Sequence, residues 1–234
     1  MKRVEPAPES IQGRPNGAKV REPEGRSRGG DLLTDLPSLR RALFPLDAPP
    51  QGAAWNLDEL GDLLPPERPR MLAAVLVGLV SREEGVSVLL TRRTDTLNHH
   101  AGQVSFPGGR VEAVDRGPLR AALRETWEEV AIPGDLIQPL GYLDPYDTIT
   151  GFRVLPLVAR LAPTYHAVPD PREVADAFEV PIGPLLEGRD IERAAVEFQG
   201  RTRHYWEYRQ GPHRIWGATA AMLVNLGRRL GAQI

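Results

Sequence analysis

Hydrophobic positions along the chain follow two different periods. Unbroken apolar runs and strict alternation of apolar and polar residues predict strands, whereas apolar residues three or four positions apart predict helices. The longest apolar run, MLAAVLVGLV over 71–80, has the length of a buried strand. The other segments that these patterns predict as strands are 86–91, 103–106, 138–143, 151–161, 192–198 and 204–209.

Helical spacing is most regular in 119–130 and in 215–230. A shorter helix is predicted at 169–178, and brief helical turns at 36–43 and 57–64. Short turns join 71–80 to 86–91, and 192–198 to 204–209 across Gly200, so both pairs predict hairpins. Strands that alternate with helices along the chain predict the α/β class, here an α/β/α sandwich with a mixed sheet.

Three regions differ in composition. Residues 1–30 contain 7 basic and 4 acidic residues and few large aliphatic ones, so they are predicted to be disordered. Residues 31–70 are rich in proline and form a helical and irregular lead-in, which we expect to pack on the domain surface. Residues 71–234 then form the main domain.

Whole-chain composition excludes several classes of function. The 234 residues include no cysteine, so disulfides, thiolate catalysis and CxxC zinc sites are excluded. A net charge of −2 gives no overall attraction to nucleic acid or to anionic membranes. The ten-residue apolar run is half of the roughly 20 residues that a membrane span needs. We therefore expect a cytoplasmic protein without nucleic-acid or membrane partners.

The stretch 106–132 carries the candidate chemistry. It opens with Pro107-Gly108-Gly109, a turn signal, and continues into the predicted helix 119–130. Glu125, Glu128 and Glu129 are spaced i, i+3, i+4, so they share one helix face. Like charges at this spacing repel, and a bound divalent cation would offset the repulsion. Taken alone, such a cluster is more often a solvated acidic face.

The residues around the cluster favour a metal site. Arg124 precedes Glu125 and is placed to hold it by a charge-assisted hydrogen bond. Asp115, in the loop before the helix, offers a further carboxylate. Hard oxygen ligands without His or Cys favour Mg²⁺ or Mn²⁺, and these ions act on phosphate esters and anhydrides. Hydrolysis of a phosphoric anhydride is the reaction class that this site would serve.

The motif resembles the Nudix box, in which Gly, five residues, Glu and seven residues precede Arg-Glu-aliphatic-x-Glu-Glu-x-Gly-aliphatic. Here Gly109-x5-Asp115 is followed by RETWEEVAI over 124–132. Asp115 stands in place of Glu, the following gap is one residue longer, Thr126 replaces the aliphatic residue and Ala131 replaces Gly. The Arg-Glu and Glu-Glu pairs are intact. The resemblance covers about residues 70–225.

A second signature is similar to that of the coenzyme A pyrophosphatase branch of this family. It reads LLTRR over 89–93, GQV over 102–104 and FPGG over 106–109. The stretches 174–181 and 215–220 also resemble that branch. The resemblance implies hydrolysis of coenzyme A to 3′,5′-ADP and 4′-phosphopantetheine, with acyl-CoA as a further substrate. Alternatives are hydrolysis of another nucleoside diphosphate derivative, such as ADP-ribose or NADH, and a non-catalytic nucleotide binder.

By this resemblance each site residue has an expected role. The expected catalytic residues are Glu125, Glu128, Arg124 and Glu173. The expected ligands of Mg²⁺ or Mn²⁺ are Glu125, Glu128, Glu129 and the carbonyl oxygen of Gly109. The expected substrate-binding residues are Arg92, Arg93 and Arg110. Which carboxylate activates the water stays open, as does the oligomeric state, for which a homodimer is one option.

Overall fold

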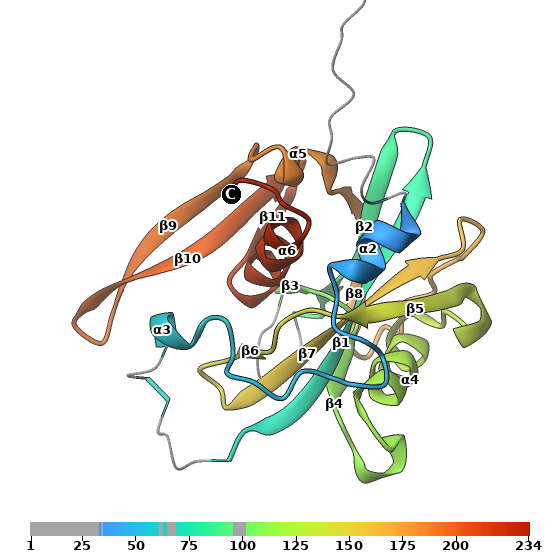
Figure 1. Cartoon of the computed structure of the whole chain (residues 1–234), viewed down its shortest axis with the longest axis horizontal. Coiled ribbons are helices and arrows are strands. Elements are labelled where there is room, and N and C mark those ends of the chain that lie inside the picture. The colour runs from blue at the N-terminus through green and yellow to red at the C-terminus, as the bar shows by residue number, and fades with distance from the viewer. Residues whose placement is uncertain (1–32, 34, 61–62, 65–68, 96–101) are drawn as a thin grey trace, which may run out of the picture.

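A mixed β-sheet forms the centre of the protein (Figure 1). The computed structural model describes residues 33, 35–60, 63–64, 69–95 and 102–234, so the predicted disorder of 1–30 lies outside them. Within the described residues, eight strands make up this sheet, with the order β3-β2-β1-β7-β5, while β4 pairs with β1, β6 with β7 and β8 with β2. The strands are β1 Met71–Arg82, β2 Gly85–Arg93, β3 Val104–Ser105, β4 Gly108–Arg110, β5 Ile137–Tyr142, β6 Tyr146–Asp147, β7 Phe152–Leu161 and β8 Val174–Pro181.

Strand β1 is buried on both faces of the sheet. It runs parallel to β7 and antiparallel to β2 and β4. Val77 and Leu79 belong to one hydrophobic core, and Leu76 and Val80 to the other. Alternate side chains of a strand point to opposite faces, so a strand covered on both faces is apolar throughout. This is why 71–80 has no polar position.

One helix covers each face of the sheet. Helix α4 (Pro118–Val130) packs Ala121, Ala122 and Val130 into the core that holds Leu76. Helix α6 (Ala218–Arg229) packs into the opposite core. The predicted α/β/α sandwich with a mixed sheet is confirmed. Within the described part of the main domain, the short helices are α5 (Gly183–Leu186) and the 3-10 helices η1 (Ala113–Asp115) and η2 (Gly134–Leu136).

A second, three-stranded antiparallel sheet lies beside α6 (Figure 1). It consists of β9 (Ile191–Phe198), β10 (Arg201–Gln210) and β11 (His213–Trp216). The hairpin predicted across Gly200 is confirmed. The last helix begins later than predicted, because 215–216 belong to β11 and pair with β10.

The predicted helix at 169–178 is wrong. Strand β8 begins at Val174 and pairs antiparallel with β2 along its length. Val174, Ala177 and Phe178 have helical spacing, but a pattern over five residues is too short to distinguish a helix from a strand. Residues 174–181 form a strand because the backbone groups at the exposed edge of β2 need hydrogen-bond partners.

The lead-in contributes to the core instead of resting on the surface. Helix α2 (Leu36–Arg41) buries Leu39, which is 1% exposed, and α3 (Leu57–Leu60) follows. The buried Asn56 side chain donates to the Asp147 carbonyl oxygen at 2.8 Å and accepts from the Asp147 amide at 3.0 Å. No helix in the described residues is long and apolar enough to cross a membrane.

Candidate active site

Two glycines let strand β4 lie close to both β1 and α4. The predicted turn at 107–109 is wrong in part, since Gly108 and Gly109 belong to β4, which pairs with β1. A Cβ on Gly108 would lie 2.4 Å from the Ala74 carbonyl oxygen. A Cβ on Gly109 would lie 2.6 Å from Glu125 Oε1. Only glycine allows both approaches, so the Gly-Gly pair brings β4 against the carboxylate helix.

Glu129 is a buried carboxylate and not part of a solvated face. Its side chain is 4% exposed. The Gly108 amide donates to Oε2 at 3.1 Å, and Arg93 Nη1 lies 3.9 Å from Oε1. Burial raises the pKa of Glu129 to about 7, against the lowering effects of the Gly108 amide and Arg93. The neighbouring Glu125 and Glu173 add to the rise in pKa because they are also negative.

Glu125 is less buried and is held by Arg124. Its side chain is 17% exposed, and Arg124 Nη1 donates to Oε1 at 3.0 Å. Burial raises the pKa of Glu125, the arginine opposes this, and Glu128 and Glu173 add to the rise. Arg124 also donates to Glu128 at 2.9 Å, although that side chain is 53% exposed. The three glutamates therefore share a face but differ widely in exposure.

Asp115 anchors Arg124. The two side chains form two parallel hydrogen bonds of 2.8 and 2.9 Å, and the Glu112 amide donates to the same carboxylate at 2.8 Å. These contacts hold the pKa of Asp115 below its usual range, with Arg124 as the largest cause. Both carboxylate oxygens of Asp115 thus accept hydrogen bonds from its own loop and from Arg124. Asp115 orients the arginine that orients Glu125.

Glu173 reaches the cluster although it lies 44 positions beyond Glu129 in the sequence. It directly precedes β8, and its carbonyl oxygen accepts from the Thr94 amide at 3.0 Å. Close by, the Asp170 amide donates to the Glu129 carbonyl oxygen at 2.8 Å. These bonds tie the segment before β8 to β2 and α4. The negative charge of Glu173 adds to the rise in the pKa of both Glu125 and Glu129.

The three predicted phosphate-binding arginines lie in different places. Arg93 faces Glu129, and its buried Nε has no hydrogen-bond partner among the described residues. Arg92 shares the opposite face of β2 with Leu90 and lies 3.8 Å from Asp95. Arg110 is exposed at the end of β4, and its carbonyl oxygen accepts from Arg124 at 3.2 Å. The structure thus places Arg93 against the carboxylates and Arg92 on the other side of the sheet.

The donor groups at this site suit a hard divalent cation. Carboxylates with a backbone carbonyl nearby are the ligands that Mg²⁺ and Mn²⁺ prefer. The positive and polar groups around the buried Glu129 do not fully offset the cost of burying its charge. Beside Glu125 there is space that any Cβ on Gly109 would fill. Within the described ranges, no three acidic, His or Cys side chains already converge at metal-binding spacing. Mutual repulsion keeps carboxylates apart, and a cation would offset that repulsion.

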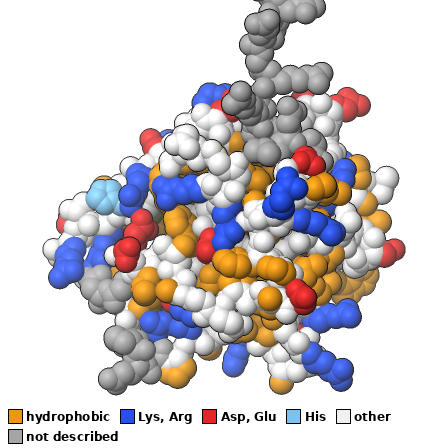
Figure 2. Space-filling view, in the orientation of Figure 1, with side chains coloured by type: hydrophobic (Ala, Val, Ile, Leu, Met, Phe, Trp, Pro, Cys, Tyr) orange, Lys and Arg blue, Asp and Glu red, His pale blue; other side chains and the backbone are white. Residues whose placement is uncertain are grey.

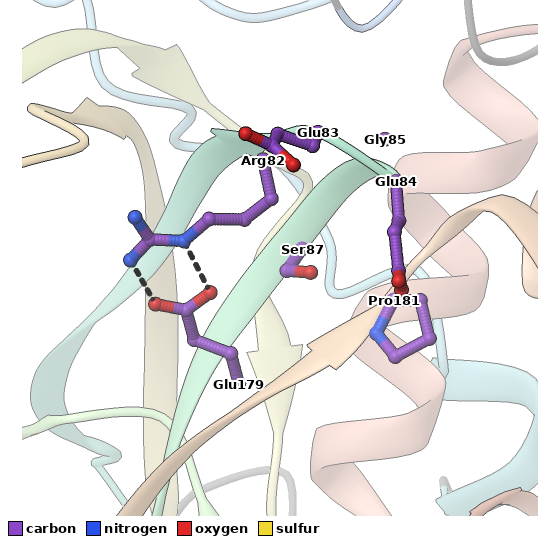
Figure 3. Close-up of a pocket in the computed structure, with 7 residues that line it drawn as sticks. All are labelled: Arg82, Glu83, Glu84, Gly85, Ser87, Glu179 and Pro181. Atoms are coloured by element: carbon purple, nitrogen blue, oxygen red, sulfur yellow. Dashed lines mark hydrogen bonds and ion pairs between the residues drawn. The ribbon is translucent and has the colours of Figure 1, made fainter.

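A separate hollow of about 460 Å³ lies at the turn between β1 and β2 (Figure 3). There Arg82 donates to both oxygens of Glu179, and the Tyr165 hydroxyl donates to the same carboxylate. Arg82 and Glu179, which line this hollow, thus already pair with each other. Arg82 lies seven residues beyond Val75, the last β1 residue paired with β4, which is about 23 Å along a strand. The hollow is therefore remote from the carboxylates.

Comparisons with known proteins identify the family of this chain. A family model described as the NUDIX domain matches residues 69–196. The chain is 38% identical over 162 residues to an uncharacterized Nudix hydrolase, NudL, of Enterobacter sp. strain 638, covering 69% of this chain and 84% of the relative. It is 41% identical over 161 residues to NudL of Cronobacter sakazakii, covering 68% and 82%. A Nudix hydrolase from M. smegmatis, RenU, superposes with a TM-score of 0.43 and 24% identity over 50% of this chain and 74% of that one.

Proposed function

The chain belongs to the Nudix hydrolase family, and from that premise we propose that it hydrolyses the diphosphate bond of coenzyme A. The products are 3′,5′-ADP and 4′-phosphopantetheine. The observation that carries this proposal is the position of the signature at 89–109. It includes the end of β2, β3 and the start of β4, and two of these strands place Arg93 and Gly108 beside Glu129. The stretch that resembles coenzyme A pyrophosphatases thus contributes two residues that contact the buried carboxylate of Glu129, which supports the proposal.

Glu125, Glu128, Glu129 and the Gly109 carbonyl oxygen would hold Mg²⁺ or Mn²⁺. When bound, such an ion neutralises phosphate charge and lowers the pKa of water. Arg124, fixed by Asp115, keeps the Glu125 carboxylate in place. One of Glu125, Glu128 and Glu173 accepts the proton of the attacking water.

Arg93 is the best-supported phosphate-binding residue of the three arginines. A buried donor without a partner costs free energy, and a phosphate oxygen would satisfy it. Its Nε has no hydrogen-bond partner among the described residues, and its Nη1 lies near Glu129. Arg110 would contact a part of the substrate farther from the cleaved bond, whereas Arg92, on the other face of the sheet, has less support as a phosphate ligand.

Product analysis tests the proposed substrate. Purified protein is incubated with coenzyme A, acetyl-CoA, ADP-ribose or NADH, each with Mg²⁺ or Mn²⁺, and the products are separated by chromatography. We expect 3′,5′-ADP from coenzyme A. Cleavage of ADP-ribose or NADH with coenzyme A left intact would instead assign another nucleoside diphosphate derivative. Binding of coenzyme A without cleavage of any compound would identify a non-catalytic binder.

Glu129→Gln tests the proposed site. The amide removes a buried charge that would ligate the cation, so we expect kcat for coenzyme A to fall by about 10³-fold or more. Glu84→Gln is the matched control because Glu84 is an exposed carboxylate at the remote β1–β2 turn. It should keep full activity. Equal activity of both variants would show that the cluster is not the reaction centre.

A further inference from the structure

Strand β9 has one open edge. Within the described part of the chain, β9 pairs with β10 on one side and with no strand on the other. Figure 1 shows β9 as the outer strand of a hairpin that projects away from the central sheet. An exposed edge presents unpaired amide and carbonyl groups to any further strand. Such an edge is therefore a candidate surface for β-strand pairing with another chain.

The hairpin geometry shows which residues of β9 present these groups. The Arg209 amide donates to the Asp190 carbonyl oxygen at 3.0 Å. This pair belongs to the same register as Phe198 and Arg201, which lie opposite each other at the two-residue turn. In an antiparallel ladder, alternate residues bond to the neighbour and the others point away. Even-numbered residues of β9 therefore bond to β10. Arg193, Ala195 and Glu197 direct their backbone groups outward.

Charge then distinguishes between the registers available to a second copy of the chain. Antiparallel pairing about a two-fold axis must place outward residues opposite outward residues. With Ala195 on the axis, Arg193 faces the partner's Glu197, and the symmetry repeats this pair. A shift that centres on Ala194 or Val196 leaves both charges opposite apolar or neutral residues, and centring on Arg193 sets two arginines face to face. One register alone pairs both charges directly.

We propose that two copies of this chain associate through β9, antiparallel, with Ala195 on the two-fold axis. The two three-stranded sheets join into one six-stranded sheet. Arg193 and Glu197 form two ion pairs across the junction, while Val196, which is 47% exposed, packs against the partner's Ala194. Arg193 already donates to Glu59 at 2.7 Å but is 46% exposed, so its other donors remain accessible.

Side-chain charge on this part of the surface agrees with the pairing. Figure 2 shows acidic and basic side chains together where the hairpin projects, at the left of the view. A surface with one sign of charge would repel its copy, whereas a mixed one can match it. The contact involves one strand from each chain and is small, so we expect a reversible dimer with a Kd on the order of 10 µM.

The test uses two charge reversals whose effects cancel only in this register. In Glu197→Arg, the arginine at 193 of each chain would face an arginine at 197 of its partner. In Arg193→Glu, the glutamate at 193 of each chain would face a glutamate at 197 of its partner. By sedimentation velocity at about 50 µM, each variant should be monomeric while the natural chain is largely dimeric. An equimolar mixture of the two variants should form a heterodimer, and Arg193→Glu with Glu197→Arg in one chain should restore the dimer. A misfolded variant would show neither recovery.

Two further variants separate backbone pairing from general charge effects. Ala195→Pro removes an outward amide without removing a bond to β10, so it should also abolish the dimer. Glu192→Arg is the matched control, since Glu192 lies on the same strand but opposite the partner's Phe198, and it should leave the dimer intact. A natural chain that stays monomeric up to about 200 µM would overturn the proposal. A dimer that survives both charge reversals would overturn it equally.

Discussion

At the residue scale, Glu129 combines burial with a charge that its surroundings balance incompletely. The Gly108 amide and Arg93 favour the carboxylate, but burial and two neighbouring glutamates disfavour it more. In the protein without a cation, this side chain binds a proton at a pH where an ordinary glutamate is ionised. A cation at the site would supply the missing positive charge, so metal binding and proton release are linked.

The raised pKa predicts how stability depends on pH in the presence of EDTA. Below about pH 4.5, Glu129 is protonated in both the folded and the unfolded chain. Between 4.5 and about 7 only the folded chain holds the proton, so the free energy of unfolding falls as pH rises. Up to about 3 kcal/mol of stability is lost by pH 8. We expect Glu129→Gln, which cannot ionise, to escape this loss.

Thermal unfolding in EDTA checks this expectation. The melting temperatures of the natural chain and of Glu129→Gln should be similar near pH 5, and the variant should melt higher at pH 8. Comparing the two proteins removes the contribution of the other titrating groups. A constant difference across this pH range would show that Glu129 ionises normally.

At the scale of elements, the approach of β4 to α4 defines the site. Gly108 faces the backbone of β1, whereas Gly109 faces the end of the Glu125 side chain. The two neighbouring glycines therefore have different structural roles. The first allows the strand to pair, and the second leaves room for a carboxylate.

Substituting alanine for each glycine in turn should show these two roles separately. Gly108→Ala would place its Cβ 2.4 Å from a backbone oxygen at a positive φ of 149°, so it should destabilise the fold by about 2 kcal/mol or more. Gly109→Ala needs only the Glu125 side chain to move. It should change stability little but lower kcat by about 10²-fold. Urea unfolding and kinetic measurements on both variants test this, and equal loss of stability would contradict it.

The end of α4 offers a second prediction at this scale. Ala131 caps the helix with φ 53° and ψ 29°, a left-handed conformation that costs a residue with a Cβ about 1 kcal/mol. The Nudix pattern has Gly at this position. Ala131→Gly should therefore raise the free energy of unfolding by about 0.5–1 kcal/mol. Ala131→Thr should lower it, and urea titration of the three proteins would reveal any other order.

At the scale of the whole molecule, the lead-in and the main domain form one folded unit. Leu39 and Leu43 are buried in the core shared with α6, and Arg229 at the end of α6 donates to the Ala42 carbonyl oxygen at 2.6 Å. The family match begins only at residue 69. Part of what stabilises this protein therefore lies before the matched region.

Two shortened chains test this contribution. A chain that starts at residue 31 keeps every described residue, so its melting temperature should stay within about 2 °C. A chain that starts at residue 69 loses Leu39 and Leu43, each worth about 2–5 kcal/mol of core packing, and should not fold cooperatively. Circular dichroism melts of both would show the difference. A stable, cooperative fold of the shorter chain would contradict it.

Local sequence was sufficient for the elements whose pattern is long and unambiguous. The ten apolar residues of 71–80 and the amphipathic segment 119–130 correspond closely to β1 and α4, because each segment is long enough to show one period. The i, i+3, i+4 spacing likewise placed the three glutamates on one helix face. The family resemblance supplied the site residues, and their catalytic roles stay predictions.

Tertiary structure decided what depends on contacts between distant segments. The edge of β2 made a strand of 174–181, and that pairing brought Glu173 to the cluster. Burial made Glu129 unlike Glu128, and two hydrogen bonds turned Asp115 into the anchor of Arg124. By itself the sequence determined the elements whose pattern is long enough to show one period, and the chemical groups that they carry, because period and composition are local. Only the packed fold decided which charges are desolvated and which partners they meet, because burial and long-range pairing exist only once the chain has folded.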